Sequence, residues 1–294
     1  MKASRGPASR SRTGRSDSLL GNGFMIIGLA YFLVPLIWLA LASTKSNSGL
    51  FSSFGFWLDR DINLGQNLQD LLARDDGAFV GWMRNTAIYA ISAAIGSTLI
   101  SALAGYGFAV YRFRGRNLLF AIILASVFVP ATILAVPLYF MLGQAGLTNS
   151  LLAVILPAMV FPFGVFLVRI YAEQAVPEEL LDAARVDGAG EFRIFATIAF
   201  RLLAPGLVTV LLFAFVGAWN NYFLPLLVLR DTDVYPLTVG LFNWNALAAQ
   251  PGQAQVLYAI VITGSVVAVV PIIVIFLVLQ RYWQHGLSLG SVKG

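Results

Sequence analysis

Three features of the sequence predict an all-α integral membrane protein with six transmembrane helices. Charged residues make up only 11% of the chain, against about 25% in a typical soluble domain, and 59% of the residues are hydrophobic. A soluble domain cannot hide that much apolar surface, because it needs a polar exterior. Five long blocks of the chain also contain no Asp, Glu, Lys or Arg. Each is long enough for a transmembrane helix, because a helix needs about 20 residues to cross a bilayer. These blocks are Ser18–Thr44, Asn85–Tyr111, Asn117–Val168, Leu202–Leu229 and Val234–Gln280.

Four of the blocks are long enough for one span each. Asn117–Val168 is long enough for two, with a polar, glycine-rich break at Gly143–Ser150. The predicted spans cover residues 23–43, 84–106, 118–142, 150–171, 203–229 and 255–280. They divide the chain into a basic tail (1–22), a six-span transmembrane domain (23–280) that contains a charged loop (172–202), and a C-terminal tail (281–294).

The first span resembles a signal peptide in one respect, because a basic segment precedes it. Its apolar run is longer than the usual hydrophobic region of a signal peptide, and no clean small-x-small cleavage site closes it. We therefore expect the segment to stay in the protein as a membrane anchor.

Basic residues orient the chain in the membrane. Arg112, Arg114 and Arg116 follow the second span, whereas the segments on the opposite side are poorer in basic residues. Five basic residues precede the first span: Lys2, Arg5, Arg10, Arg12 and Arg15. By the positive-inside rule both termini are then cytoplasmic, and so is the charged loop between spans four and five. We expect the basic tail to act as an orientation signal in the lipid bilayer, with no nucleic acid as a partner.

The second span carries Ser97, Ser101 and Gly105 at four-residue spacing, which lets helix backbones approach closely in lipid. The third and fourth spans contain prolines, which remove backbone donors and predict kinks, either along a pathway or as ordinary packing features. These prolines are Pro130, Pro137, Pro157 and Pro162.

The charge-free blocks bear on the source of energy for transport. Carriers driven by protons or sodium usually need an ionisable group at membrane depth, and the blocks contain no Asp, Glu, Lys or Arg. Energy for any transport is therefore expected to enter from outside the spans. The absence of cysteine and the single histidine exclude thiolate sites and most histidine-based metal sites, so we expect no metal site.

The charged loop after the fourth span predicts a helix, a turn and a second helix. Pro177 with Glu178 and Glu179 is typical of a helix start, since acidic side chains favour the positive end of the helix dipole. Gly188 can take the left-handed conformation that ends such a helix, and Glu191 opens the next one. From the residues alone, a helix that docks in a partner's groove and a solvated loop are equally supported.

The same loop resembles the EAA motif (EAA-x3-G-x9-I-x-L-P) of permeases from binding-protein-dependent ABC importers, through Asp182-Ala183-Ala184, Gly188 and Ile198. In that family the loop is a coupling helix that docks in a cleft of the ATPase subunit. The chain departs from the motif in having Asp182 for glutamate and Phe200-Arg201 for the Leu-Pro end. The ATPase-coupling residues that this resemblance implies are Glu179, Asp182, Ala183, Ala184, Arg185, Asp187, Gly188 and Ile198.

Two further segments resemble the second membrane subunit of maltose-type transporters. Trp219-Asn220-Asn221-Tyr222-Phe223 with Pro225 is similar to the WNEF-x-x-P segment, and the C-terminal end is similar to QR(Y/F)…GL…GAVKG. The resemblance implies that the tail contacts the ATPase through Gly290, Ser291 and Lys293. We expect Trp219, Asn220, Asn221 and Tyr222 to line a substrate path, because aromatic faces and amides bind sugars. The alternative is that they form an interfacial belt or bonds between helices.

The resemblance implies a non-catalytic permease of the bacterial inner membrane that imports a di- or oligosaccharide by alternating access. The expected partners are a homologous permease in a heterodimer, two ABC ATPase subunits and an extracytoplasmic solute-binding protein. The chain has no G-x-x-x-x-G-K-[S/T] loop, so ATP and Mg are expected on the ATPases and no cofactor on this chain. The alternatives are an importer for glycerol phosphate or a polyol, or a secondary transporter.

Overall fold

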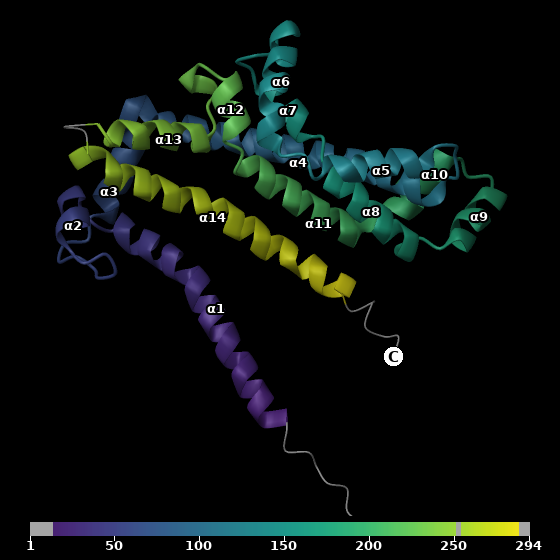
Figure 1. Cartoon of the computed structure of the whole chain (residues 1–294), viewed down its shortest axis with the longest axis horizontal. Coiled ribbons are helices and arrows are strands. Elements are labelled where there is room, and N and C mark those ends of the chain that lie inside the picture. Colours follow the sequence, from purple (N-terminus) through teal and green to yellow (C-terminus); the bar gives the residue numbers. More distant parts are fainter. Residues whose placement is uncertain (1–13, 251–253, 288–294) are drawn as a thin grey trace, which may run out of the picture.

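The structure is a computed structural model that describes residues 14–250 and 254–287, and within them it contains helices and no strand. Helices α4, α8, α11 and α14 form the long body of the molecule (Figure 1). Helices α2, α3 and α13 lie at one end and α9 and α10 at the other, whereas α6, α7 and α12 project from the middle of the body. The long helices are α1 (Gly14–Ser43), α4 (Ala78–Val110), α8 (Pro162–Ala175), α11 (Phe200–Trp219) and α14 (Ala254–Leu287). The other α-helices are α2 (Asn47–Ser52), α3 (Leu64–Ala73), α5 (Arg116–Ser126), α6 (Ala131–Gln144), α7 (Leu151–Ala158), α9 (Glu178–Val186), α10 (Glu191–Ile194), α12 (Phe223–Val228) and α13 (Leu237–Ala248).

Five helical stretches among the described residues are long and apolar enough to cross a membrane. They are Gly21–Ser43, Leu64–Val110, Leu151–Ala175, Glu191–Trp219 and Leu257–Tyr282. The pair α5 and α6 becomes a sixth if its two bent halves count as one span. The all-helical membrane fold is thus confirmed, with five or six candidate spans. Helix α1 begins at Gly14, inside the predicted tail, although its candidate span begins at Gly21.

The predicted third span, residues 118–142, is not one straight helix. It bends by 102° between α5 and α6, where Pro130 caps the start of α6. Proline cannot donate the backbone bond that would continue α5, so the chain turns there. Pro137 lies inside α6 without a break. In the fourth span, Pro162 starts α8 after the short interruption that ends α7.

The predicted fifth span, residues 203–229, is wrong at both ends. The helix begins at Glu191, passes through a π-helical turn at Phe195–Ala199 and stops at Trp219. Within the break that follows, Pro225 has no N–H to donate to the carbonyl of Asn221, four residues back. Thr238 takes that place, and its hydroxyl donates to the Asn221 carbonyl at 2.7 Å.

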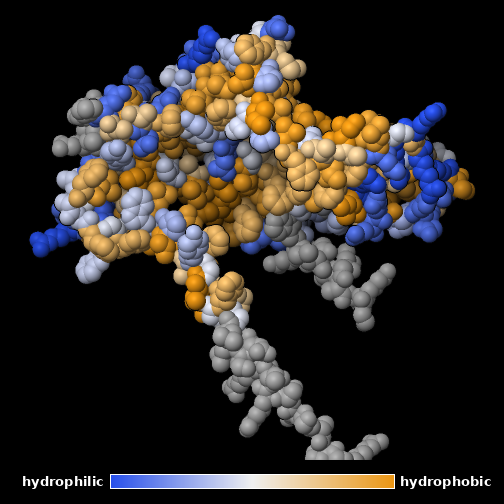
Figure 2. Space-filling model, viewed as in Figure 1, coloured by the Kyte–Doolittle hydropathy of each residue, from blue (hydrophilic) through white to orange (hydrophobic). Residues whose placement is uncertain are grey.

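The core lies where α4 packs against α8 and α11. A side chain at Gly105 on α4 would come within 2.6 Å of Val168 Cβ and 2.9 Å of the Arg169 backbone nitrogen, so glycine is needed for this approach. The predicted close packing of the second span is therefore confirmed at Gly105. Hydrophobic residues cover the long helices, and hydrophilic residues gather at the end that carries α9 and α10 (Figure 2).

Candidate functional site

Helix α9 is the first element of the charged loop, and it follows α8 at one end of the molecule (Figure 1). Pro177 precedes it, and Glu178 and Glu179 occupy its first turn, as predicted. A carboxylate in this position stabilises the positive end of the helix dipole. The end of the molecule opposite α9 carries α2, α3 and α13.

One side chain of α9 anchors it to the core. Leu181 is only 1% exposed and packs in a cluster with Tyr106 of α4, Val168 of α8, Ile194 of α10 and Leu203 of α11. Burying a leucine side chain contributes about 1.5 to 3 kcal/mol. Helix α9 is therefore seated on the three core helices rather than tethered by its ends alone.

The turn after α9 has the predicted glycine conformation. Gly188 has φ of +79°, a region that other L-residues occupy at a steric cost, and it ends the helix. The N–H of Asp187 donates to the Ala183 carbonyl at 3.0 Å, and the N–H of Ala189 donates to the Ala184 carbonyl at 3.0 Å. Helix α10 then starts at Glu191, so the predicted helix–turn–helix is confirmed.

Arg185 joins α9 to α10 through charged hydrogen bonds. Its Nε donates to Glu191 Oε1 at 2.7 Å, and its Nη1 donates to Asp182 Oδ1 at 2.8 Å. The Oη of Tyr111, which follows the last residue of α4, donates to Glu191 Oε2 at 2.7 Å. Bonds to the two carboxylates, first Glu191 and then Asp182, raise the pKa of Arg185 above its ordinary value. The ends of α4, α9 and α10 thus meet at Glu191.

The predicted coupling residues do not all share one place. Ala184 and Arg185 are half-buried, and Ile198 lies in the π-helical turn, away from α9. The others are exposed on α9 or its turn: Glu179, Asp182, Ala183, Asp187 and Gly188.

Sequence reasoning missed four residues of this site. Val186 and Phe192 expose 88% and 79% of their surface beside the turn, although both are apolar. Their signal was present in the sequence, since both are large apolar residues flanked by charges. Glu191 was predicted only as a helix start, and its contact with Tyr111 carried no signal, because Tyr111 lies far from the loop in the chain and only the fold brings it there.

The predicted path residues lie at the break after α11. Trp219 is buried, stacks on Phe215 with ring centroids 5.4 Å apart, and donates from Nε1 to the Ala268 carbonyl at 3.2 Å. Trp219 therefore bonds between helices, as the alternative to a substrate-path role predicted. Asn220 is exposed, and its amide donates to its own helix. Asn221 and Tyr222 are half-buried, and the Tyr222 ring lies 5.0 Å from that of Phe242.

The predicted tail residues Gly290, Ser291 and Lys293 lie outside the described residues. Within residues 14–250 and 254–287, no group of three histidine, aspartate or glutamate side chains is placed to hold a metal ion.

A hollow of about 690 Å³ lies at the end opposite α9. Asp75, Asp76, Asp233 and Arg84 line it together with Trp82. Trp244 fixes one wall, because its Nε1 donates to Asp75 Oδ2 at 2.8 Å. This end therefore presents a carboxylate-rich concave surface that the sequence did not reveal.

Comparison with known proteins agrees with this arrangement. The family described as "Binding-protein-dependent transport system inner membrane component" matches residues 96–288. The chain is 35% identical over 284 residues to the arabinooligosaccharides transport system permease protein of Halalkalibacterium halodurans, which covers 95% of this chain and 99% of that protein. It is 33% identical over 275 residues to the lactose transport system permease protein of Rhizobium radiobacter, with 92% and 95% covered.

The fold is also that of a solved structure. The crystal structure of a bacterial ABC transporter involved in the import of the acidic polysaccharide alginate matches with a TM-score of 0.80 at 24% identity, covering 94% of this chain and 100% of that chain. The relatives are transport permeases, which places this chain with transporters rather than with catalytic enzymes. The chain belongs to the family of binding-protein-dependent transport system inner membrane components and is a multi-pass protein of the inner membrane.

Proposed function

We propose that this chain is the membrane-spanning permease subunit of an ATP-driven ABC importer, and that it passes a di- or oligosaccharide across the membrane by alternating access. Two relatives are named for an oligosaccharide and for lactose, which supports a saccharide of more than one unit. The charge-free blocks of the spans support a source of energy other than an ion gradient.

The observation that carries the proposal is the junction at Arg185 and Glu191. Helix α9 is seated on the core by Leu181 and bonded to the first residue of α10 by Arg185. From Glu191 one helical stretch runs to Trp219, at the break that holds the proposed path residues. A partner that pushes on α9 would therefore move this stretch as a lever, because packed helices transmit displacement as rigid elements.

We propose that the partner on α9 is an ABC ATPase subunit. The exposed surface of α9 and its turn offers small residues, Ala183 and Gly188, for close fit, and apolar Val186 and Phe192 beside them for burial. Two such ATPases hold ATP and Mg, and this chain holds neither. The tail residues Gly290, Ser291 and Lys293 are proposed as a second contact with the ATPases.

The remaining partners follow from the two ends of the molecule. We place α9 and both termini in the cytoplasm, and α2, α3 and α13 outside. The N-terminal end of α1 and the C-terminal end of α14 both point away from α2 and α3 (Figure 1), which supports termini on one side. The acidic hollow is proposed as part of the contact with an extracytoplasmic solute-binding protein, and a homologous permease completes a heterodimer.

For the substrate path we propose Asn220, Asn221 and Tyr222, with Trp219 holding α11 against α14. Asn220 and Asn221 lie where the helix is broken, and irregular backbone at membrane depth is tolerated where it lines a cavity or is buried in protein. Amide groups and a half-buried aromatic ring suit hydrogen bonding and stacking with a sugar.

The test is uptake by the complete transporter, purified with its partner chains and reconstituted in liposomes with the binding protein outside. Radiolabelled lactose, raffinose, an arabino-oligosaccharide and glycerol 3-phosphate are offered separately. We expect uptake of at least one saccharide when ATP is enclosed, and none when a membrane potential is imposed without ATP. Uptake driven by the potential alone would support a secondary transporter, and uptake of glycerol 3-phosphate only would overturn the saccharide assignment.

A further inference from the structure

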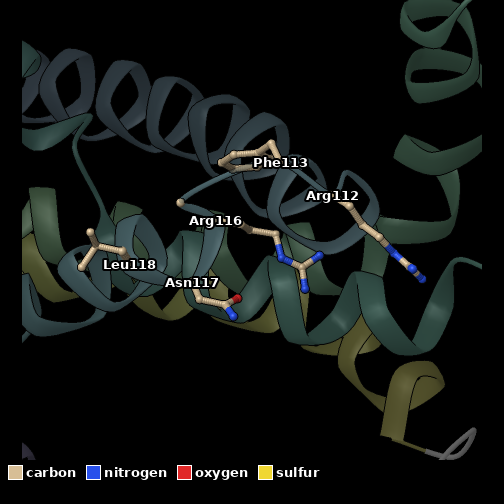
Figure 3. A pocket seen from close by; sticks show the side chains of 6 residues that line it. Arg112, Phe113, Arg116, Asn117 and Leu118 are labelled. Atoms are coloured by element: carbon tan, nitrogen blue, oxygen red, sulfur yellow. The ribbon is translucent and has the colours of Figure 1, made fainter.

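The short loop between α4 and α5 forms a basic pocket. A cavity of about 490 Å³ is lined by Arg112, Phe113, Gly115, Arg116, Asn117 and Leu118, and none of these residues is acidic. The guanidinium groups of Arg112 and Arg116 extend to the same side of the loop, with Asn117 beside Arg116, while Phe113 points away (Figure 3). The proposed coupling function uses none of these residues.

No acidic side chain among the described residues neutralises the positive charge in this pocket. Among the described residues, no ion pair involves Arg112 or Arg116, and Arg116 makes only a long bond of 3.4 Å from Nη1 to the Tyr111 carbonyl. The nearby Arg169 is already occupied, because it pairs with Glu173 at 2.9 Å and lies 3.9 Å over the Phe120 ring.

Backbone groups add to the pocket's preference for an anion. Helix α5 starts at Arg116 with Gly115 as its cap, and no side chain caps it. Within the described part of the chain, the N–H groups of Asn117 and Leu118 have no acceptor, and both residues line the cavity. Two guanidinium groups and two free N–H groups are the donors that bind phosphate oxygens.

Exposed apolar side chains surround the pocket. Leu118, Leu119 and Ile122 of α5 expose 67%, 48% and 57% of their surface, and Phe113 exposes 43%. Helix α5 is one half of the bent candidate span. These apolar side chains would contribute nothing to the binding of a free phosphate ion, whereas they can contact the acyl chains of a phospholipid. Basic residues next to a transmembrane helix attract anionic lipid headgroups.

We propose that this pocket binds an anionic phospholipid, with the headgroup phosphate between Arg112, Arg116 and the start of α5 and the acyl chains along Leu118 and Ile122. The bound lipid would hold the α4–α5 loop at the membrane surface, next to Tyr111 and the α9 junction.

The test is native mass spectrometry of the full-length chain in detergent, alone or with its co-purified partners, after addition of phosphatidylglycerol or phosphatidylcholine. We expect the first phosphatidylglycerol to bind more tightly than phosphatidylcholine. The double variant Arg112→Gln/Arg116→Gln should lose about fivefold in that affinity for each arginine, or roughly 25-fold in total. Arg112→Lys/Arg116→Lys should keep most of it, since the charge remains.

Two controls keep the result specific. Arg193→Gln removes an exposed charge on α10, outside the pocket, and should leave lipid affinity unchanged. Thermal unfolding of each variant in phosphatidylcholine checks that the fold is intact. The proposal is overturned if Arg193→Gln weakens binding equally, or if inorganic phosphate displaces the lipid at equal concentration. It is also overturned if the double variant binds lipid as the wild type does but co-purifies with less of the ATPase subunit, because the two arginines would then contact the ATPase and not a lipid.

Discussion

Arg185 illustrates how a single side chain can position an element without adding much stability. Its bonds to Asp182 and Glu191 lie at the surface, where ion pairs contribute little to the free energy of folding. The planar guanidinium nevertheless fixes direction, because it presents donors to two carboxylates at once. With its pKa raised by these bonds, Arg185 stays charged at physiological pH.

Replacing Arg185 by lysine tests this positioning role. Lysine keeps the charge but is a single point donor, so it cannot hold both carboxylates in the same geometry. We expect ATP-dependent uptake by the reconstituted transporter to fall about two- to tenfold while basal ATP hydrolysis persists. Arg193→Lys, on the exposed face of α10, is the matched control. Equal uptake by Arg185→Lys and the wild type would contradict the role.

Gly188 and Gly190 form a natural pair of test positions at the turn. A Cβ at either position would have open space around it, with no neighbouring atom within 4 Å. Only Gly188 has positive φ, at +79°, whereas Gly190 has φ of −69°. Gly188→Ala should therefore strain the turn by about 1 to 2 kcal/mol, and Gly190→Ala should not. We expect reduced uptake per ATP hydrolysed only for Gly188→Ala. A similar fall in uptake per ATP hydrolysed in both variants would mean that the positive φ at Gly188 is irrelevant to coupling.

At the scale of helices, the small residues of α4 decide how closely the core packs. Gly105→Leu would drive a side chain into Val168 and the backbone of Arg169. Overpacking of this kind costs about 1 to 3 kcal/mol, so the thermal unfolding temperature in detergent should fall. Gly107→Ala on the same helix meets no atom within 4 Å and should leave that temperature unchanged or raise it. A Gly105→Leu protein as stable as the wild type would refute the close packing.

The sequence predicted the helices of the charged loop better than the ends of the spans. Pro177, Gly188 and Glu191 are local signals, and the helices begin and end beside them. Hydropathy cannot locate a bend, because bent and straight helices have the same composition. Prolines do not locate a bend reliably either, because Pro130 precedes a new helix after the 102° bend, whereas Pro137 and Pro205 lie inside helices. The hydroxyl of Thr238 bonds the Asn221 carbonyl in the break after Trp219, and only the fold brings these two residues together.

For the whole molecule, the candidate site could be predicted only where it is contiguous in the chain. The α9 turn was predictable, whereas the Tyr111–Glu191 contact and the acidic hollow join segments far apart in sequence. The proposed function uses both ends of the molecule, the α9 end for the ATPase and the α2 end for the binding protein, and these two ends lie opposite each other (Figure 1).

The chain contains no cysteine, so its orientation can be tested with single introduced thiols. Ser52 of α2 and Ala183 of α9 are both exposed and small. We expect a membrane-impermeant maleimide to label Ser52→Cys in intact spheroplasts and Ala183→Cys only in inside-out vesicles. The cysteine-free wild type is the control for background. Labelling of both positions from one side would refute six spans with α9 inside.

The central claim is that α9 is the element on which the ATPase acts, and cross-linking tests it most directly. Val186 is 88% exposed beside the turn, so Val186→Cys can reach a partner without disturbing the core. Inside-out vesicles containing the complete transporter are treated with a short bifunctional maleimide after single cysteines are placed around the ATPase cleft. We predict a covalent adduct of this chain with the ATPase, at a yield that changes when ATP is added. No adduct from Val186→Cys, together with a strong one from an exposed cysteine at α2, would contradict the account.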